Sequence, residues 1–204
     1  MKWKAARSLL STMFNKPKAE IMKTKTLLFT VIAFLFTSLQ TMAQNNDKHI
    51  LVAYFSATGT TARAAEKLAN VTGGELYAIT PAKSYTSTDL DWNDKQSRSS
   101  VEMNDPKARP AIKGKKENIV DYDVVFIGYP IWWDLAPHII NTFIESHDLK
   151  GKIVIPFATS GGSTLAGSAA ALKKAYPALN WKEGRLLNRA DEKTIRTWVE
   201  KLGF

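Results

Sequence analysis

The chain has 204 residues, of which 45% are hydrophobic and 23% are charged, with no cysteine and a formal net charge of +9. This length and composition predict a globular fold with a sizeable core and exclude a disordered or fibrous chain. The lack of cysteine also excludes disulfides, cysteine-ligated metal centres and cysteine nucleophiles.

Most of the positive charge lies in the first 43 residues. They carry seven basic side chains and one acidic side chain, whereas residues 44–204 carry 21 basic and 18 acidic groups, a net charge of only +3. A nucleic-acid-binding protein would need its basic charge spread over one face of the folded domain. The distribution therefore argues against a nucleic-acid partner.

Residues 1–43 are predicted to be an N-terminal extension and signal peptide. After Met22, a short basic stretch precedes an apolar run at residues 27–39, and small residues stand at positions 41 and 43. The run is shorter than the ~20 residues of a membrane-spanning helix, and the small residues suit signal peptidase. We expect cleavage after Ala43 and export to the periplasm, with membrane contact through an uncleaved anchor as the alternative. Met22 is a possible true start of the protein.

Apolar runs alternate with helix-forming segments over residues 44–204. Continuous apolar runs are typical of strands buried on both faces of a parallel sheet, and helices are indicated by apolar positions three or four residues apart. In chain order we predict a strand at 49–55, a helix at 62–69, strands at 75–79 and 124–129, a helix at 136–146, a strand at 152–157, a helix at 164–176, a fifth strand at 181–187 and a last helix after Asp191.

This alternation predicts one α/β domain with a doubly wound, five-stranded parallel sheet and helices on both faces. Residues 80–120 interrupt the pattern, because they are polar, contain three prolines and show little periodicity. A helix at about 89–101 is expected within them. So long a stretch in a compact domain is usually functional or disordered, and the sequence assigns it no role.

The first of three predicted turns that follow strands carries a possible phosphate site. Ligands of open α/β sheets bind at the carboxyl ends of the strands. This turn has four hydroxyl side chains and a glycine, and it leads into a helix whose first N–H groups lack partners. A phosphomonoester fits this pattern better than a nucleotide, since Walker A and dinucleotide motifs are absent. An ordinary turn with a helix N-cap is the alternative. The candidate residues are Ser56, Ala57, Thr58, Gly59, Thr60 and Thr61.

The second and third turns supply aromatic and backbone groups. Two adjacent tryptophans follow the third strand, and exposed indoles there would cover a planar ligand or an interface, although one of them is expected to pack in the core. The third turn has two glycines, which let the backbone approach the edge of a polar ring. Asp134 is interpreted as a solvated or capping carboxylate. The candidate residues are Pro130, Ile131, Trp132, Trp133 and Asp134 in the second turn, and Thr159, Ser160, Gly161, Gly162 and Ser163 in the third.

Residues 52–68, with the sequence VAYFSATGTTARAAEKL, resemble the phosphate loop of the flavodoxin family, and the resemblance extends over nearly all of residues 48–203. It implies a flavodoxin-like sheet with strand order 2-1-3-4-5 and a bound FMN. On this resemblance Ser56 and residues 58–61 hold the FMN phosphate, residues 130–133 flank the isoalloxazine, and residues 159–163 form the far loop. Asp134 departs from the family, which often has glycine there, and Ala53 stands where a larger apolar residue is usual.

The resemblance implies a monomeric one-electron carrier that serves a redox partner protein or a small electron acceptor. A flavin-dependent NAD(P)H or quinone-type reductase is one alternative, although no nicotinamide-binding motif is present. A non-redox binding module with a vestigial flavin site is the other, and the intact hydroxyls and both tryptophans argue against it. The protein itself is expected to contribute no catalytic residue and no metal ligand, because the cofactor would carry the redox step.

Overall fold

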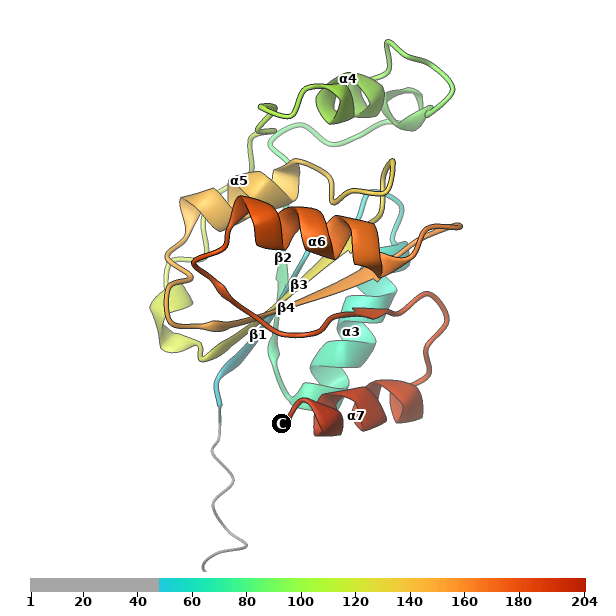
Figure 1. Cartoon of the computed structure of the whole chain (residues 1–204). Coiled ribbons are helices and arrows are strands. Elements are labelled where there is room, and N and C mark those ends of the chain that lie inside the picture. The colour runs from blue at the N-terminus through green and yellow to red at the C-terminus, as the bar shows by residue number, and fades with distance from the viewer. Residues whose placement is uncertain (1–47) are drawn as a thin grey trace, which may run out of the picture. The chain divides into compact units, whose positions relative to one another are not determined.

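The structure, a computed structural model, describes residues 48–204, and the predicted signal segment lies outside this range. Strands and helices alternate along the described residues as the sequence predicts (Figure 1). The elements are β1 (Ile50–Tyr54), α3 (Thr60–Thr72), β2 (Glu75–Ala78), the 3₁₀ turn η1 (Thr88–Leu90), α4 (Arg98–Asn104), the 3₁₀ turn η2 (Ile119–Asp121), β3 (Val124–Pro130), α5 (Ile139–Ser146), β4 (Ile153–Thr159), α6 (Leu165–Ala175), β5 (Asn180–Trp181), β6 (Arg185–Leu186) and α7 (Glu192–Lys201).

The sheet has the order β2-β1-β3-β4-β5 with every pair parallel, which confirms the predicted doubly wound fold. The chain adds β2 on one side of β1, and it adds β3 and the later strands on the other side, so the strand order reverses between β1 and β3. Neighbouring strands on either side of such a reversal send their connections to opposite faces, so a crevice opens at the carboxyl ends of β1 and β3. The fold therefore places the first and second predicted turns next to each other.

The fifth strand is divided, where a single strand at 181–187 was predicted. β5 and β6 are two residues long each, and both pair with β4. The carbonyls of Val154 and Ala158 accept hydrogen bonds from the fifth strand at 2.9 and 2.8 Å. Because alternate residues of a strand face the same neighbour, Pro156 between them also faces the fifth strand. Proline has no N–H to donate, and the ladder is interrupted at that position.

Two apolar clusters cover the two faces of the sheet. Successive residues of β3 alternate between them, with Val125 and Ile127 in one cluster and Val124 and Phe126 in the other. The first cluster includes the buried residues of α5, and the second includes those of α3 and α7. Figure 1 accordingly shows α5 and α6 on one side of the sheet and α3 and α7 on the other. Burial on both faces explains why these strands read as continuous apolar runs.

Residues 80–120, called the insertion from here on, fold into η1, α4 and η2. Residues 80–82 pair with residues 111–113, because the Ala82 amide donates to the Ala111 carbonyl and the Lys113 amide donates to the Thr80 carbonyl, each at 2.7 Å. The helix begins at Arg98, later than predicted, because Ser97 caps it by accepting from the Ser100 amide. Figure 1 shows α4 outside both helical layers. Across residues 48–204 no helix has the length and apolarity needed to cross a membrane, and no group of acidic and histidine side chains is arranged to hold a metal ion.

Candidate functional site

A cavity of about 370 Å³ lies where the first and second predicted turns meet. Three segments of the chain line it: the turn after β1, the turn after β3, and the insertion. The lining residues are Ser56, Ala57, Thr58, Thr61, Leu90, Trp92, Ser99, Pro130, Ile131, Trp132 and Trp133. The sequence singled out eight of these residues, and it missed the three that the insertion supplies.

The turn after β1 ends at the uncapped N-terminus of α3. Gly59 is the N-cap residue with a φ of 84°, a left-handed conformation that glycine adopts without strain, and no side chain accepts a bond from the first turn of the helix. The first N–H groups of a helix have no partner within it, and they carry the positive end of the helix dipole. This end of α3 can therefore bind an anion.

The four hydroxyls of this turn have different surroundings. Ser56 and Thr58 line the cavity. Thr61 also borders it, but its hydroxyl is buried and lies 2.8 Å from the hydroxyl of Thr159 at the end of β4. Thr60 is exposed, and its hydroxyl accepts a long bond of 3.4 Å from Arg63. Ser56 and Thr58 thus line the cavity, Thr61 lines it and also joins two loops, and a phosphate role for Thr60 and Thr61 stays a prediction.

The turn after β3 is tight and strained. Trp132 and Leu135 exchange backbone hydrogen bonds of 3.0 and 2.9 Å, which leaves Trp133 and Asp134 between them with φ values of 47° and 61°. A bulky side chain rarely adopts this left-handed conformation, because its Cβ crowds the backbone. Strain of this kind persists where the surroundings enforce it, and it is frequent at ligand-binding sites.

The two tryptophans of this turn take different roles. Trp132 packs on the core, with its ring centroid 5.7 Å from Phe55 and 5.5 Å from Tyr85 in edge-to-face geometry. Trp133 remains 48% exposed at the cavity. One tryptophan therefore packs in the core, as expected, and the other presents its indole to the cavity. Asp134 is exposed and does not line the cavity.

The third turn is held by its own hydrogen bonds and does not line the cavity. The Ser160 hydroxyl accepts from the amides of Gly162 and Ser163 at 3.1 and 2.7 Å, and the Ser160 amide donates to the side chain of Asn188 at 2.6 Å. Asn188 was not among the predicted residues. A role for residues 159–163 at a ligand edge stays a prediction.

An aromatic contact joins the insertion to the rest of the domain beside Trp132. The ring of Tyr85 lies 5.6 Å from that of Phe55, and the guanidinium of Arg98 lies 3.9 Å above the Tyr85 ring. Arg98 also forms an ion pair of 2.6 Å with Glu102, which accepts a bond from the Tyr85 hydroxyl. Burial and the Glu102 carboxylate raise the pKa of Tyr85, so its hydroxyl stays protonated.

A second contact joins the insertion to the helical layer. Arg109 donates two bonds to the carboxylate of Glu145 on α5, at 2.8 and 2.9 Å. The Tyr176 hydroxyl donates to the same carboxylate at 2.7 Å. The Arg109 guanidinium lowers the pKa of Glu145, which keeps the pair charged. The insertion is thus fixed to the domain through Arg109 as well as through Tyr85.

Comparison with known proteins gives a family match and similar solved structures. A sequence profile described as Flavodoxin matches residues 49–202. The crystal structure of a candidate flavoprotein from Bacteroides eggerthii DSM 20697 is 74% identical, with a TM-score of 0.76, over 77% of this chain and 99% of that one. Its counterpart from Bacteroides uniformis ATCC 8492 is 57% identical, with a TM-score of 0.74, over 75% and 98% of the two chains.

A more distant structure shows the fold alone. The flavoprotein of Lactobacillus acidophilus NCFM, solved in complex with FMN, is 22% identical, with a TM-score of 0.59, and the match covers 74% of this chain and 99% of that chain. A search of curated proteins returned no match. The profile match and the two Bacteroides structures cover nearly all of the described residues, and the chain belongs to the flavodoxin family.

Proposed function

We propose that the cavity binds FMN and that the protein transfers electrons through it. One observation carries the proposal: the uncapped N-terminus of α3, with Ser56 and Thr58, opens into the same cavity as Trp132 and Trp133. Phosphate and a flat ring are the two ends of FMN, and this cavity offers a partner for each. A flavoprotein of the same fold has been solved with FMN, which adds support.

The residues present fit the two ends of the cofactor. The hydroxyls of Ser56 and Thr58 and the first N–H groups of α3 would hold the phosphate by neutral donors, and the positive end of the helix dipole would balance its charge. The exposed indole of Trp133 would cover the ring. When bound, FMN supplies reversible uptake and release of electrons, while the protein positions it and limits access.

The composition of the cavity argues against a reaction that relies on acid–base catalysis by a protein side chain. None of the side chains that line the described cavity is acidic or basic. Proton transfer to a substrate needs a titratable group within hydrogen-bond reach, and these walls provide none. A flavin-dependent NAD(P)H or quinone-type reductase remains the second candidate, because FMN, when bound, would supply the redox chemistry without a titratable side chain in the cavity wall.

We also propose that the protein acts outside the cytoplasm as a monomer. The basic stretch, apolar run and small residues that end at Ala43 support removal of residues 1–43 and export to the periplasm, with an uncleaved membrane anchor as the alternative. A redox partner protein or a small electron acceptor would then exchange electrons with it there. Mass spectrometry of the protein recovered from the periplasm tests this, since cleavage after Ala43 would leave Gln44 as the first residue.

Titration of the full chain with FMN tests the binding proposal. We expect saturable quenching of flavin fluorescence at one FMN per chain, because indole rings beside a flavin quench its emission. The double variant Ser56→Ala/Thr58→Ala should weaken FMN binding more than riboflavin binding, since riboflavin has no phosphate. Thr197→Ala removes an exposed hydroxyl on α7, away from the cavity, and serves as the control. Absence of FMN binding would favour the vestigial-site alternative.

A second assay separates a carrier from a reductase. The FMN-loaded protein would be mixed with NADPH and a soluble quinone, and NADPH oxidation followed by absorbance. A carrier should show no sustained turnover, yet after chemical reduction it should pass electrons to an added one-electron acceptor. Steady oxidation of NADPH would instead establish the reductase.

A further inference from the structure

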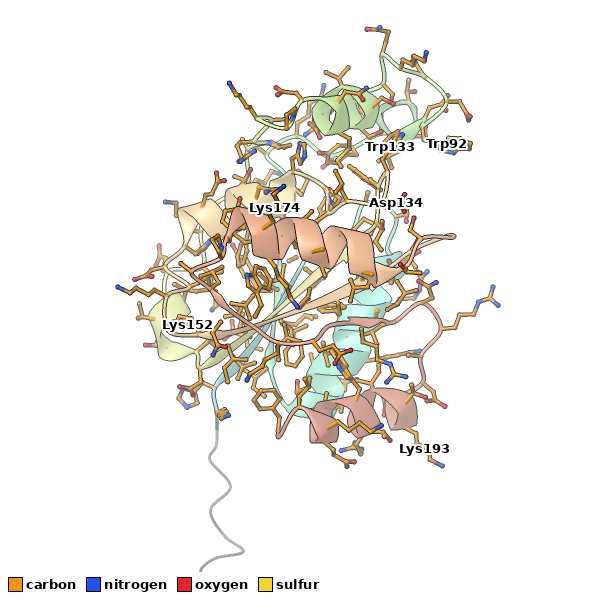
Figure 2. All side chains as sticks on the ribbon, in the orientation of Figure 1. Trp92, Trp133, Asp134, Lys152, Lys174 and Lys193 are labelled. Atoms are coloured by element: carbon orange, nitrogen blue, oxygen red, sulfur yellow. The ribbon has the colours of Figure 1, made fainter. Side chains whose placement is uncertain are left out.

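The insertion completes the cavity from a side that the rest of the described domain, residues 48–79 and 121–204, leaves open; this part is called the β/α framework. Leu90, Trp92 and Ser99 line the cavity together with the turns after β1 and β3. Figure 2 labels Trp92 and Trp133 close to each other, near the end of the domain that carries α4. Two indoles from separate parts of the chain, one in the framework and one in the insertion, therefore border the same space.

Short polar side chains fix the backbone on both sides of Trp92. The carboxylate of Asp91 accepts from the Asn93 amide at 3.0 Å, and that of Asp94 accepts from the Gln96 amide at 2.8 Å. Just before them, Thr86 and Asp89 bond each other's backbone amides. Such turns satisfy the backbone locally and set its direction without an apolar core. Trp92 is thus presented by an ordered segment.

The indole of Trp92 is unusually exposed for a side chain held in this way. It is 71% exposed, against 48% for Trp133 and 6% for Trp198 in the core. Among residues 48–204, its ring is paired with no other aromatic ring, whereas Trp132 packs against Phe55 and Tyr85. An exposed indole on an ordered, polar segment at the edge of a cavity is a surface suited to covering a planar ligand.

Contacts with the rest of the domain hold the insertion in place before any ligand arrives. The Tyr85 and Arg98 contact lies beside Trp132, so one aromatic cluster supports both the framework side and the insertion side of the cavity. The pair of Arg109 and Glu145 fixes the far end of the insertion. A wall positioned in advance binds its ligand without a large ordering cost.

We propose that Trp92 is an aromatic wall of the flavin site and that it stacks on the flat ring of the cofactor. The insertion would then serve to supply this wall, in place of the turn at residues 159–163, which does not line the cavity. The inference rests on the proposed function, because it assumes that the cavity receives a flavin.

Flavin titrations of the full chain and three variants test the inference. Trp92→Ala should raise the Kd for FMN by roughly 10- to 100-fold, the range expected for loss of one stacking contact on a heteroaromatic ring. It should raise the Kd for riboflavin by a similar factor, because the ring is common to both ligands. Trp92→Phe keeps an aromatic face and should stay within a few-fold of the wild type. Val101→Ala, an exposed change on α4 outside the cavity, should have no effect.

Four outcomes of these titrations would contradict the role of Trp92. Equal FMN affinity for the wild type and Trp92→Ala would overturn the inference while leaving the proposed function intact. An equal loss in Val101→Ala would also overturn it, since the effect would then come from the fold of the insertion. Loss for FMN with no loss for riboflavin would place Trp92 at the phosphate and contradict stacking. Failure of the wild type to bind any flavin would overturn both proposals.

Discussion

The β/α framework and the insertion line one cavity but are held together by different interactions. The framework buries two apolar clusters against its sheet, with most residues of β1, β3 and β4 fully buried. The insertion contributes few buried apolar side chains, and its shape comes from side-chain bonds to its own backbone and from contacts of Tyr85, Arg109 and Lys116 with the framework. Changes in the framework should therefore act on global stability, and changes in the insertion on the site.

The largest effect is expected in the framework. Phe126 on β3 is fully buried, and its ring packs against Trp198 and Phe204. Phe126→Ala should lower the free energy of unfolding by about 3–5 kcal/mol, because it removes buried contacts and leaves a cavity. Urea denaturation measures this change. A decrease in the free energy of unfolding below about 1 kcal/mol would show that the core of the framework repacks freely. It would contradict the claim that changes in the framework act mainly on global stability.

A smaller effect is expected at the aromatic anchor. Tyr85→Ala removes two ring pairs and the stacked guanidinium of Arg98, at a cost of about 1–3 kcal/mol in the free energy of unfolding. It should also weaken FMN binding, since Trp132 loses its neighbour. Tyr85→Phe keeps the ring and should retain most of both properties. If Tyr85→Ala changed global stability as much as Phe126→Ala does, the insertion would belong to the main core.

A pH-dependent contact links the two regions through His147. Its Nδ1 lies 2.7 Å from the Phe143 carbonyl and must donate to it, while its Nε2 accepts from the Lys116 amide of the insertion at 2.9 Å. Only the neutral ring satisfies both bonds. Burial lowers the pKa of His147 below its ordinary value of 6.5, and the Phe143 carbonyl opposes this shift.

The sign of the pH effect follows from this lowered pKa. The unfolded chain binds the proton more tightly, so the contribution of His147 is complete above about pH 6.5 and is lost as the pH falls below that value. The slope cannot exceed about 1.4 kcal/mol per pH unit for one proton. The free energy of unfolding of the wild type, measured by urea denaturation, should fall as the pH is lowered from 7 to 5. His147→Gln should remove most of this decrease. An unchanged slope in the variant would assign it to other groups.

The smallest effect concerns Asp134, next to the strained Trp133. A carboxylate near the ring would disfavour the negative charge that reduction adds, and so lower the midpoint potential of bound FMN. Asp134 is exposed and its charge is screened by water, so Asp134→Asn should raise the potential by only tens of millivolts. Redox titration of the FMN-loaded protein measures the shift. An unchanged potential would place this carboxylate too far from the ring to matter.

The framework could be predicted from the sequence because its periodicity and its burial have the same cause. The runs at 49–55 and 124–129 are continuous because both faces of β1 and β3 are covered, and Asp191 caps α7 by accepting from the Thr194 amide at 2.8 Å. The division of the fifth strand was missed because it depends on Pro156, a residue of the neighbouring strand.

The insertion could not be predicted in the same way, since its contacts join residues far apart in the sequence. Arg109 contacts Glu145, and Tyr85 contacts Phe55, although the members of each pair are far apart in the sequence. No periodic pattern in the sequence predicts either contact. A tryptophan between aspartates in a polar stretch was the one available signal for Trp92. The contact between the hydroxyls of Thr61 and Thr159 could not be predicted either, because the two residues become neighbours only in the folded sheet.

A crystal structure of the full chain grown with FMN is the most direct test of the shared cavity. We expect the phosphate within hydrogen-bond distance of Ser56, Thr58 and the first N–H groups of α3, and the ring in contact with Trp133 from the framework and Trp92 from the insertion. FMN bound elsewhere, or a ring that touches the framework alone, would contradict the claim that both regions build the site.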